Sequence, residues 1–278
     1  MYGLNESGYH SSRNDDTRIC GYITQKIREL LFPFLIARFK NRASFEIITD
    51  TKRQREGVDI ILYRGPCREP YYYDLKAQHQ WVNVPIQTHA LEIDSYQNLR
   101  GKGRTLVDGW FVNDDLLTTH YMFIAVVANS KQVGRREWRK ITPDNIEGLE
   151  VFGTCKARLN EDFSANGLTR DRIFAKRDEI RGMGIAGKVK MQTGIDGVEI
   201  MKCDRNTFPE ESVNLLISKE KLSKLSDFYA FADLNGIKTY KERGRLLISE
   251  YKPVCPAKTV EKPKVVKQGE FSFDLTAA

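Results

Sequence analysis

The chain has 278 residues, of which 41% are hydrophobic and 29% charged, as in an ordinary folded protein with one large core or two modest domains. The 44 lysines and arginines exceed the 37 aspartates and glutamates, and the resulting net charge of +7 favours a polyanionic partner such as nucleic acid. No apolar run approaches the roughly 18 residues of a membrane span, and the scattered cysteines argue against a zinc site or a disulfide framework. The polar N-terminal stretch lacks the apolar core of a signal peptide, so we expect a cytoplasmic protein that does not enter a membrane.

The first predicted element is a long amphipathic helix. Residues 14–17 (Asn-Asp-Asp-Thr) are all suitable N-caps, and apolar residues then recur at helical spacing as far as Phe34. Pro33 should kink this helix or begin a second piece, because proline has no N–H to donate within a helix.

The first strand is predicted over residues 44–49, and a charged loop follows over residues 50–56. Two further strands, joined by a turn, come next. Residues 57–63 and 71–78 each contain strong strand formers, and the two prolines and the glycine between them mark a reversal. The economical interpretation is a β-hairpin.

The hairpin would bring two acids, Asp59 and Asp74, and the lysine Lys76 together. Asp74, Lys76 and Gln78 share one face of the second strand, because side chains alternate along a strand. If Asp59 pairs opposite Asp74, Tyr63 falls opposite Pro70, and the two carboxylates lie about 5 Å apart at Cβ. Carboxylates that close repel each other, and a bound cation such as Mg²⁺, which takes oxygen ligands, would offset the repulsion.

An acid at the start of one strand, followed by acid-x-Lys on the next, resembles the PD-(D/E)XK nuclease superfamily, which includes many restriction endonucleases and Holliday junction resolvases. Asp59 matches the first acid, Asp74 the second and Lys76 the lysine, while Val58 stands where the name-giving proline would be. The resemblance covers roughly the first half of the chain. It implies an α/β fold with a restriction-endonuclease-like central mixed β-sheet flanked by helices, and leaves additional α+β elements for the second half.

The resemblance also implies a chemistry, which is Mg²⁺-dependent hydrolysis of phosphodiester bonds in DNA, with Mn²⁺ as a substitute. The metal would be held by Asp59, Asp74 and the backbone carbonyl of Leu75. Lys76 would orient the attacking water and offset charge in the transition state, and Gln78 would position the nucleophile or a phosphate oxygen.

A third metal ligand has two candidates. In nucleases of this kind a first helix often lends a further acid, which would be Glu29, and Glu46 on the predicted first strand is the second candidate. An exposed Glu29 paired with a neighbouring base is the alternative. For the whole site the alternatives are an edge hairpin with solvated charges, or a catalytically silent nucleic-acid-binding or structural module of a phage or mobile element.

Basic and aromatic residues after the hairpin suit contact with DNA. Trp81 lies in the loop that leaves the sheet near the site, where it would stack on a base or sugar, or else cover a core edge. The candidate contacts to the DNA backbone are Lys102, Arg104, Arg135 and Arg136. A solvated surface is the alternative for these charges.

The remaining pattern predicts further helices and strands. We expect a helix over residues 91–99 that crosses the sheet, strands over residues 106–112, 119–128, 198–202 and 213–217, a helix over residues 168–181 capped by Thr169, and a helix from Ser218 to Ala232. The glycines at positions 184, 187, 194 and 197 predict turns or a mobile segment.

The expected organisation is a nuclease-like core over residues 1–150, an extension or smaller lobe over residues 151–251, and a disordered basic linker with a terminal docking peptide over residues 252–278. The spacing of Gln268, Phe271 and Phe273 resembles the bacterial sliding-clamp binding motif, so the clamp is a candidate partner besides DNA. A terminal strand that folds back onto the parent domain is the alternative for this peptide.

Overall fold

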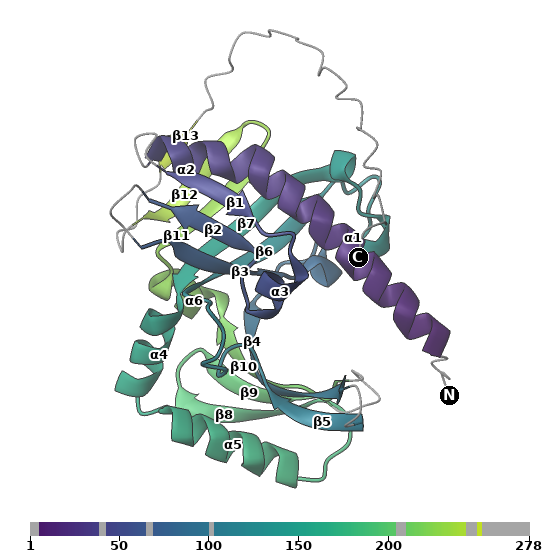
Figure 1. The fold of residues 1–278 in the computed structure, drawn as a ribbon, viewed down its shortest axis with the longest axis vertical. Helices are drawn as coiled ribbons and strands as arrows, with labels where there is room; N and C mark the ends of the chain where they lie inside the picture. The colour runs from purple at the N-terminus through teal and green to yellow at the C-terminus, as the bar shows by residue number, and fades with distance from the viewer. Residues whose placement is uncertain are drawn as a thin grey trace, which may run out of the picture.

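The computed structural model describes residues 6–38, 43–64, 69–99, 103–203, 210–242 and 249–251, and these residues build two β-sheets (Figure 1). The large sheet has the order β1 (Ser44–Ile47), β2 (Ile60–Tyr63), β3 (Tyr71–Ala77), β6 (His120–Ala128), β7 (Ile146–Cys155), β11 (Phe228–Asp233), β12 (Gly236–Glu242) and β13 (Ser249–Tyr251). It is a mixed sheet, because β3 and β6 are parallel while its other neighbours are antiparallel. The predicted α/β class with a central mixed sheet is therefore confirmed.

The small sheet is antiparallel and has the order β5 (Gly103–Asp108), β4 (Thr88–Leu99), β10 (Val213–Ser218), β9 (Val198–Lys202) and β8 (Val189–Ile195). The α-helices of the described chain are α1 (Glu6–Lys26), α2 (Phe32–Arg38), α3 (Thr51–Arg55), α4 (Lys156–Ala165), α5 (Arg170–Gly182) and α6 (Lys219–Leu225). Short turns of other helix types are η1 (Ile27–Leu31), η2 (His79–Trp81), η3 (Trp138–Lys140) and η4 (Pro143–Asn145).

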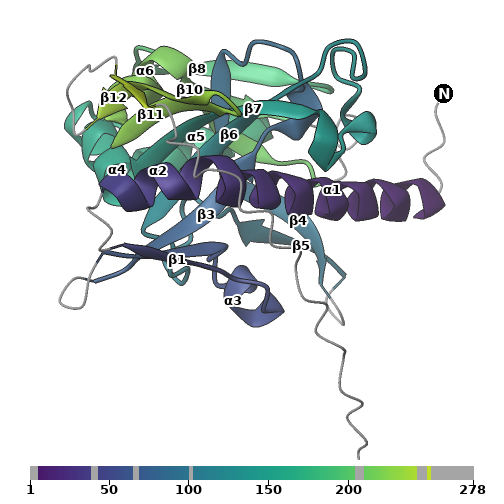
Figure 2. The same ribbon diagram turned by 90° about the horizontal axis from the view of Figure 1, so that it is seen from above.

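The predicted first helix is present and crosses one face of the large sheet (Figures 1 and 2). Its stripe of Ile19, Ile23, Ile27 and Leu31 is buried in one core with residues of β3 and β6. The π-helical turn η1 stands directly before α2, whose second residue is Pro33, so a wider turn appears where the missing proline N–H interrupts the regular ladder. No helix in the described part of the chain has both the length and the apolarity to cross a membrane.

The prediction of a crossover helix over residues 91–99 is wrong. This segment belongs to β4, a strand of 12 residues that pairs with β5 and β10. Leu91 and Ile93 are fully buried, and this alternation of apolar residues with period two is that of a strand. The strand predicted over residues 106–112 is correspondingly shifted and ends at Asp108, as part of β5.

Three further predictions are corrected by the structure. Residues 50–56 form the short helix α3, because Asp50 caps it through the Lys52 and Arg53 N–H groups. The glycine-rich segment contains β8 and its turn into β9, rather than turns alone. The helix capped by Ser218 ends at Leu225, and residues 228–233 form the strand β11, whose buried residues alternate.

The two sheets do not divide the chain at residue 150. Residue 150 lies inside β7, β4 and β5 belong to the small sheet, and β11 to β13 return to the large one. The predicted boundary therefore does not separate two sets of strands. A second apolar core contains side chains of both sheets and of α4 and α5, so the sheets pack into one continuous structure.

Candidate active site

The β2–β3 hairpin brings Asp59 and Asp74 together, in the predicted register. Ile60 pairs with Tyr73, and the same register places Asp59, directly before β2, across from Asp74. The Asp59 N–H donates to the Tyr73 carbonyl over 2.8 Å, and the Leu75 N–H donates to Asp59 Oδ2 over 2.7 Å. The Asp59 carboxylate is therefore tied to the backbone of the strand that carries Asp74.

Lys76 completes the predicted constellation. Its Nζ lies 2.8 Å from Asp74 Oδ2 and 4.2 Å from the centre of the Trp110 ring. The Asp74 side chain is 8% exposed and the Lys76 side chain 23%, so the pair is largely removed from water but open on the lysine side. Leu75 and Ala77 point the other way and pack against the core under α1. The two acids and the lysine thus share one face of the hairpin.

The carboxyl groups lack enough compensating charge. Burial raises the pKa of Asp74 to about 6, against the opposing effect of Lys76, and the neighbouring Asp59 adds to the rise. Burial also raises the pKa of Asp59, against the Leu75 N–H and Lys76. One lysine therefore faces two desolvated acids. Closely spaced carboxylates with an adjacent backbone carbonyl are the oxygen donors that Mg²⁺ takes, so these residues fit a divalent cation.

The metal-free protein is expected to lose stability as the pH rises from about 4 to about 6. The folded-state pKa of Asp74, about 6, lies above its usual 3.8, so the folded protein binds the proton more tightly than the unfolded chain does. The tighter proton binding at Asp74 adds about 3 kcal/mol to the free energy of unfolding. This stabilisation is complete below about pH 4 and is lost as the pH rises through about 6. Urea unfolding in EDTA across this range measures it.

Asp74→Asn should lack this pH-dependent component, whereas Glu147→Gln, which changes an exposed carboxyl on β7, should keep it. Parallel stability curves for wild type and Asp74→Asn would show that Asp74 titrates normally. Added Mg²⁺ should raise the stability of the wild type at pH 7 and leave Asp74→Asn nearly unchanged.

A third buried acid, on the small sheet, senses the charge of Lys76. Glu92 lies on β4, where burial raises its pKa against the opposing charge of Lys76. Ser95 Oγ donates to its Oε1 over 3.3 Å. The backbone at Gly109 passes close to the backbone of Glu92, and only glycine allows this, because a Cβ at that position would lie 2.4 Å from the Glu92 carbonyl oxygen. The close crossing holds the Glu92 backbone in place.

The sequence interpretation missed Glu92 because residues 91–99 were predicted to be a helix. The signal was present, since the apolar residues Leu91 and Ile93 flank Glu92 with the period of a strand. A strand there turns Glu92 away from the apolar core that contains its two neighbours.

The two acids proposed from the sequence are engaged elsewhere. Glu29 accepts hydrogen bonds from Gln25 and from Lys26, each over 2.8 Å. Glu46 accepts from the Tyr63 hydroxyl over 2.8 Å and lies 3.4 Å from Arg53. Within the described residues, neither carboxylate is in contact with the Asp59–Asp74 pair, and no group of three or more acids, histidines or cysteines lies close enough together to hold a metal ion.

Gln78 joins the end of β3 to the start of β4. Its N–H donates to the Ile124 carbonyl over 2.9 Å, and its Nε2 lies 3.4 Å from the Thr88 carbonyl. Its Oε1 is buried and has no hydrogen-bond partner in the described part of the chain. This oxygen is available to a ligand, consistent with the predicted positioning role.

The candidate DNA contacts fall in two places. Trp81 is 40% exposed and lies under the guanidinium of Arg136, and Arg135 is exposed beside it. Arg104 lies on β5, stacks on Tyr96 and pairs with Glu211 over 2.7 Å, so its charge is partly neutralised. Lys102 lies outside the described residues, as do Gln268, Phe271 and Phe273.

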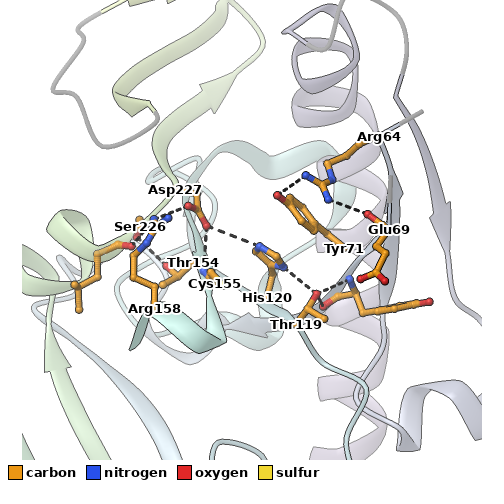
Figure 3. Close-up of polar contacts among 12 residues, drawn as sticks. Arg64, Glu69, Tyr71, Thr119, His120, Thr154, Cys155, Arg158, Ser226 and Asp227 are labelled. Carbon is orange, nitrogen blue, oxygen red and sulfur yellow. Dashed lines mark hydrogen bonds and ion pairs between the residues drawn. The ribbon is translucent and has the colours of Figure 1, made fainter. Parts of the chain in front are cut away.

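A second polar cluster joins several elements at the start of β6 (Figure 3). The His120 Nδ1 lies 2.9 Å from Thr119 Oγ1, and the ring lies against Tyr71, with centroids 3.9 Å apart and the ring planes tilted by 33°. Its Nε2 is 3.9 Å from Asp227, which is paired with Arg158. Burial lowers the pKa of His120 to about 4, against the effect of Asp227, so the imidazole is neutral near pH 7. Neutral and enclosed, His120 links β3, β6 and the segment before β11.

Comparisons of the chain with protein-family models, with curated proteins and with solved structures gave no match. The PD-(D/E)XK resemblance is therefore still a prediction, carried by the Asp59, Asp74 and Lys76 pattern.

Proposed function

We propose that this protein is a Mg²⁺-dependent nuclease that hydrolyses phosphodiester bonds in DNA. The observation that carries the proposal is the pair of desolvated carboxyl groups of Asp59 and Asp74, held beside Lys76 on one face of the hairpin. A folded protein gains nothing in stability from two buried acids sharing one lysine, so a functional reason is required. A bound Mg²⁺ would polarise the scissile phosphate and lower the pKa of an attacking water.

The side chains around the pair have distinct roles in this proposal. Asp59, Asp74 and the Leu75 carbonyl would hold the cation, and Glu92 on β4 would add negative charge near Lys76. Lys76 moves its Nζ from Asp74 to the phosphate or the attacking water, where it stabilises developing negative charge. Gln78 holds the water or a phosphate oxygen through its unpaired Oε1. Trp110 limits the freedom of the Lys76 side chain.

DNA is the proposed substrate because the chain carries a net charge of +7 and exposed arginines near the hairpin. We also propose that β1, β2, β3 and β6 form the restriction-endonuclease-like core, with three antiparallel strands followed by a fourth parallel to the third. The helix α1 on one face of this sheet supports that proposal (Figure 2). In place of a crossover helix, the connection from β3 to β6 runs through β4 and β5.

The direct test is cleavage of DNA by the purified full-length chain. Supercoiled plasmid and labelled linear DNA should be nicked or degraded with Mg²⁺ or Mn²⁺ and left intact with EDTA. Calorimetric titration with Ca²⁺, which takes the same oxygen ligands, should show binding that Asp59→Asn abolishes. DNA binding without cleavage under every cation, and unaffected by Asp59→Asn, would instead favour the silent binding module.

A further inference from the structure

Two tryptophan–arginine contacts lie on and beside the neighbouring turns η2 and η3, and their residues Trp81, Arg136, Trp138 and Arg139 are here called the Trp81 platform. The guanidinium of Arg136 lies 4.2 Å from the centre of the Trp81 ring, and that of Arg139 lies 4.8 Å from the Trp138 ring. Trp81 is 40% exposed, far more than the tryptophan of a core. Its large flat ring is therefore presented to solvent with an arginine already stacked on it.

The Trp81 platform is built before any ligand arrives. Arg136 has a φ of 64°, a left-handed conformation that an arginine rarely adopts, and its N–H donates to the Val82 carbonyl over 3.1 Å. His79 lies beneath, with its ring 5.2 Å from Trp138 and its Nε2 2.9 Å from Asp16 of α1. The backbone strain at Arg136 is maintained by these contacts, and strain of this kind is concentrated at functional positions.

The charges on the Trp81 platform are of two kinds. Arg139 pairs with Asp15, and Lys140 pairs with Glu137, so these two are neutralised within the protein. Lys131, Arg135 and Arg136 are exposed, and none of the three forms an ion pair with another described residue. Arg136 lies on the exposed Trp81 ring, and Lys131 and Arg135 are close to it in sequence, so the three cations suit a chain of phosphates.

The Trp81 platform lies next to the candidate active site along the chain. The turn η2 begins directly after Gln78, and Trp81 is five positions after Lys76. Even a fully extended chain would separate the two Cα atoms by no more than roughly 17 Å. A short stretch of single-stranded nucleic acid is long enough to span that separation.

We propose that the Trp81 platform stacks an unpaired base, so that the substrate of this site is single-stranded DNA or a single-stranded tail or flap. The proposal rests on the proposed nuclease function and names its substrate class. Bases in a duplex are stacked on one another and expose only their edges, so an isolated flat ring gains little from them. An unpaired base offers its whole face, and alanine substitution of such a ring commonly weakens binding severalfold to a hundredfold.

The test compares binding of labelled oligothymidylate and of a matched duplex by the full-length protein in EDTA, where no cleavage occurs. Trp81→Ala and Arg136→Gln are expected to weaken single-strand binding about tenfold, with less than a twofold change for the duplex. Tyr63→Ala is the matched control, because Tyr63 is 39% exposed and carries no stacked arginine among the described contacts. Arg135→Ala should weaken both substrates equally, as a phosphate contact does.

A second readout is tryptophan fluorescence, in which the test variant keeps an aromatic ring at position 81. Oligothymidylate should quench tryptophan emission in the wild type, and Trp81→Phe should remove most of that quenching. Equal effects of Trp81→Ala on single strands and duplex, or none on either, would overturn the proposal. If the nuclease function alone is wrong, the single-strand preference persists without cleavage. If the stacking alone is wrong, cleavage persists without that preference.

Discussion

Asp74→Asn and Lys76→Met should each reduce the rate of DNA cleavage on the order of a hundredfold or more, because each removes a charge that acts in the transition state. Asp74 is a proposed cation ligand, and an amide in its place has no negative charge to hold the cation. Lys76 is the cation that shares the face with the two acids, 2.8 Å from Asp74 Oδ2. Gel assays under single-turnover conditions measure the loss.

Stability separates this loss of activity from misfolding. Asp74→Asn should leave the melting temperature of the metal-free protein at pH 7 unchanged or raised, because it removes a buried charge beside Asp59. Lys76→Met should lower it, because the two acids then lose their positive partner. Cleavage by both variants at the wild-type rate would show that the site is wrongly assigned.

Three glutamates serve as graded controls. Glu29→Gln and Glu46→Gln should retain near wild-type cleavage, because both carboxylates are bound to neighbours away from the aspartate pair. Glu92→Gln should cut DNA more slowly than the other two, because Glu92 is a buried acid whose carboxyl interacts electrostatically with Lys76. The opposite ranking would restore the first-helix acid as the third ligand.

Arg181→Met is expected to destabilise the protein by about 3–5 kcal/mol, the usual cost of leaving a buried charge unpaired. Arg181 lies on α5 and forms a two-pronged contact with Asp94 of β4, with one N–O distance of 3.0 Å. Asp94 is 0% exposed. Arg177 also approaches Asp94, at 3.6 Å, but does not replace the lost bonds. Denaturant unfolding measures the loss.

The matched control is Lys224→Met, which breaks the exposed Lys224–Glu220 pair and should leave the free energy of unfolding nearly unchanged. The double variant Arg181→Met with Asp94→Asn should recover part of the stability lost by Arg181→Met alone, because the orphaned charge is gone. A loss below about 1 kcal/mol for Arg181→Met would mean that water reaches Asp94. Since Asp94 lies two positions after Glu92 on β4, the same variant also tests how firmly the small sheet supports the candidate site.

Local pattern alone was enough to predict the hairpin and the acids on it. The turn residues between β2 and β3 and the strand formers on either side act over a few positions, and they set the register that places Asp59 across from Asp74. The helix stripe to Leu31, the apolar strand β6 and the Thr169 cap of α5 were predicted for the same reason. In each of these elements the residues that decide the structure are neighbours in the chain.

Only the tertiary structure decided where β4 and β11 belong. Both contain apolar residues whose spacing fits a helix or a strand over a short window, and each becomes a strand because neighbouring strands supply its hydrogen bonds. Those neighbours are far away in the sequence, since β4 pairs with β10 and β11 pairs with β7. The place of β4 beside the large sheet, and the interleaving of the two halves of the chain, follow from pairings between residues far apart in the sequence.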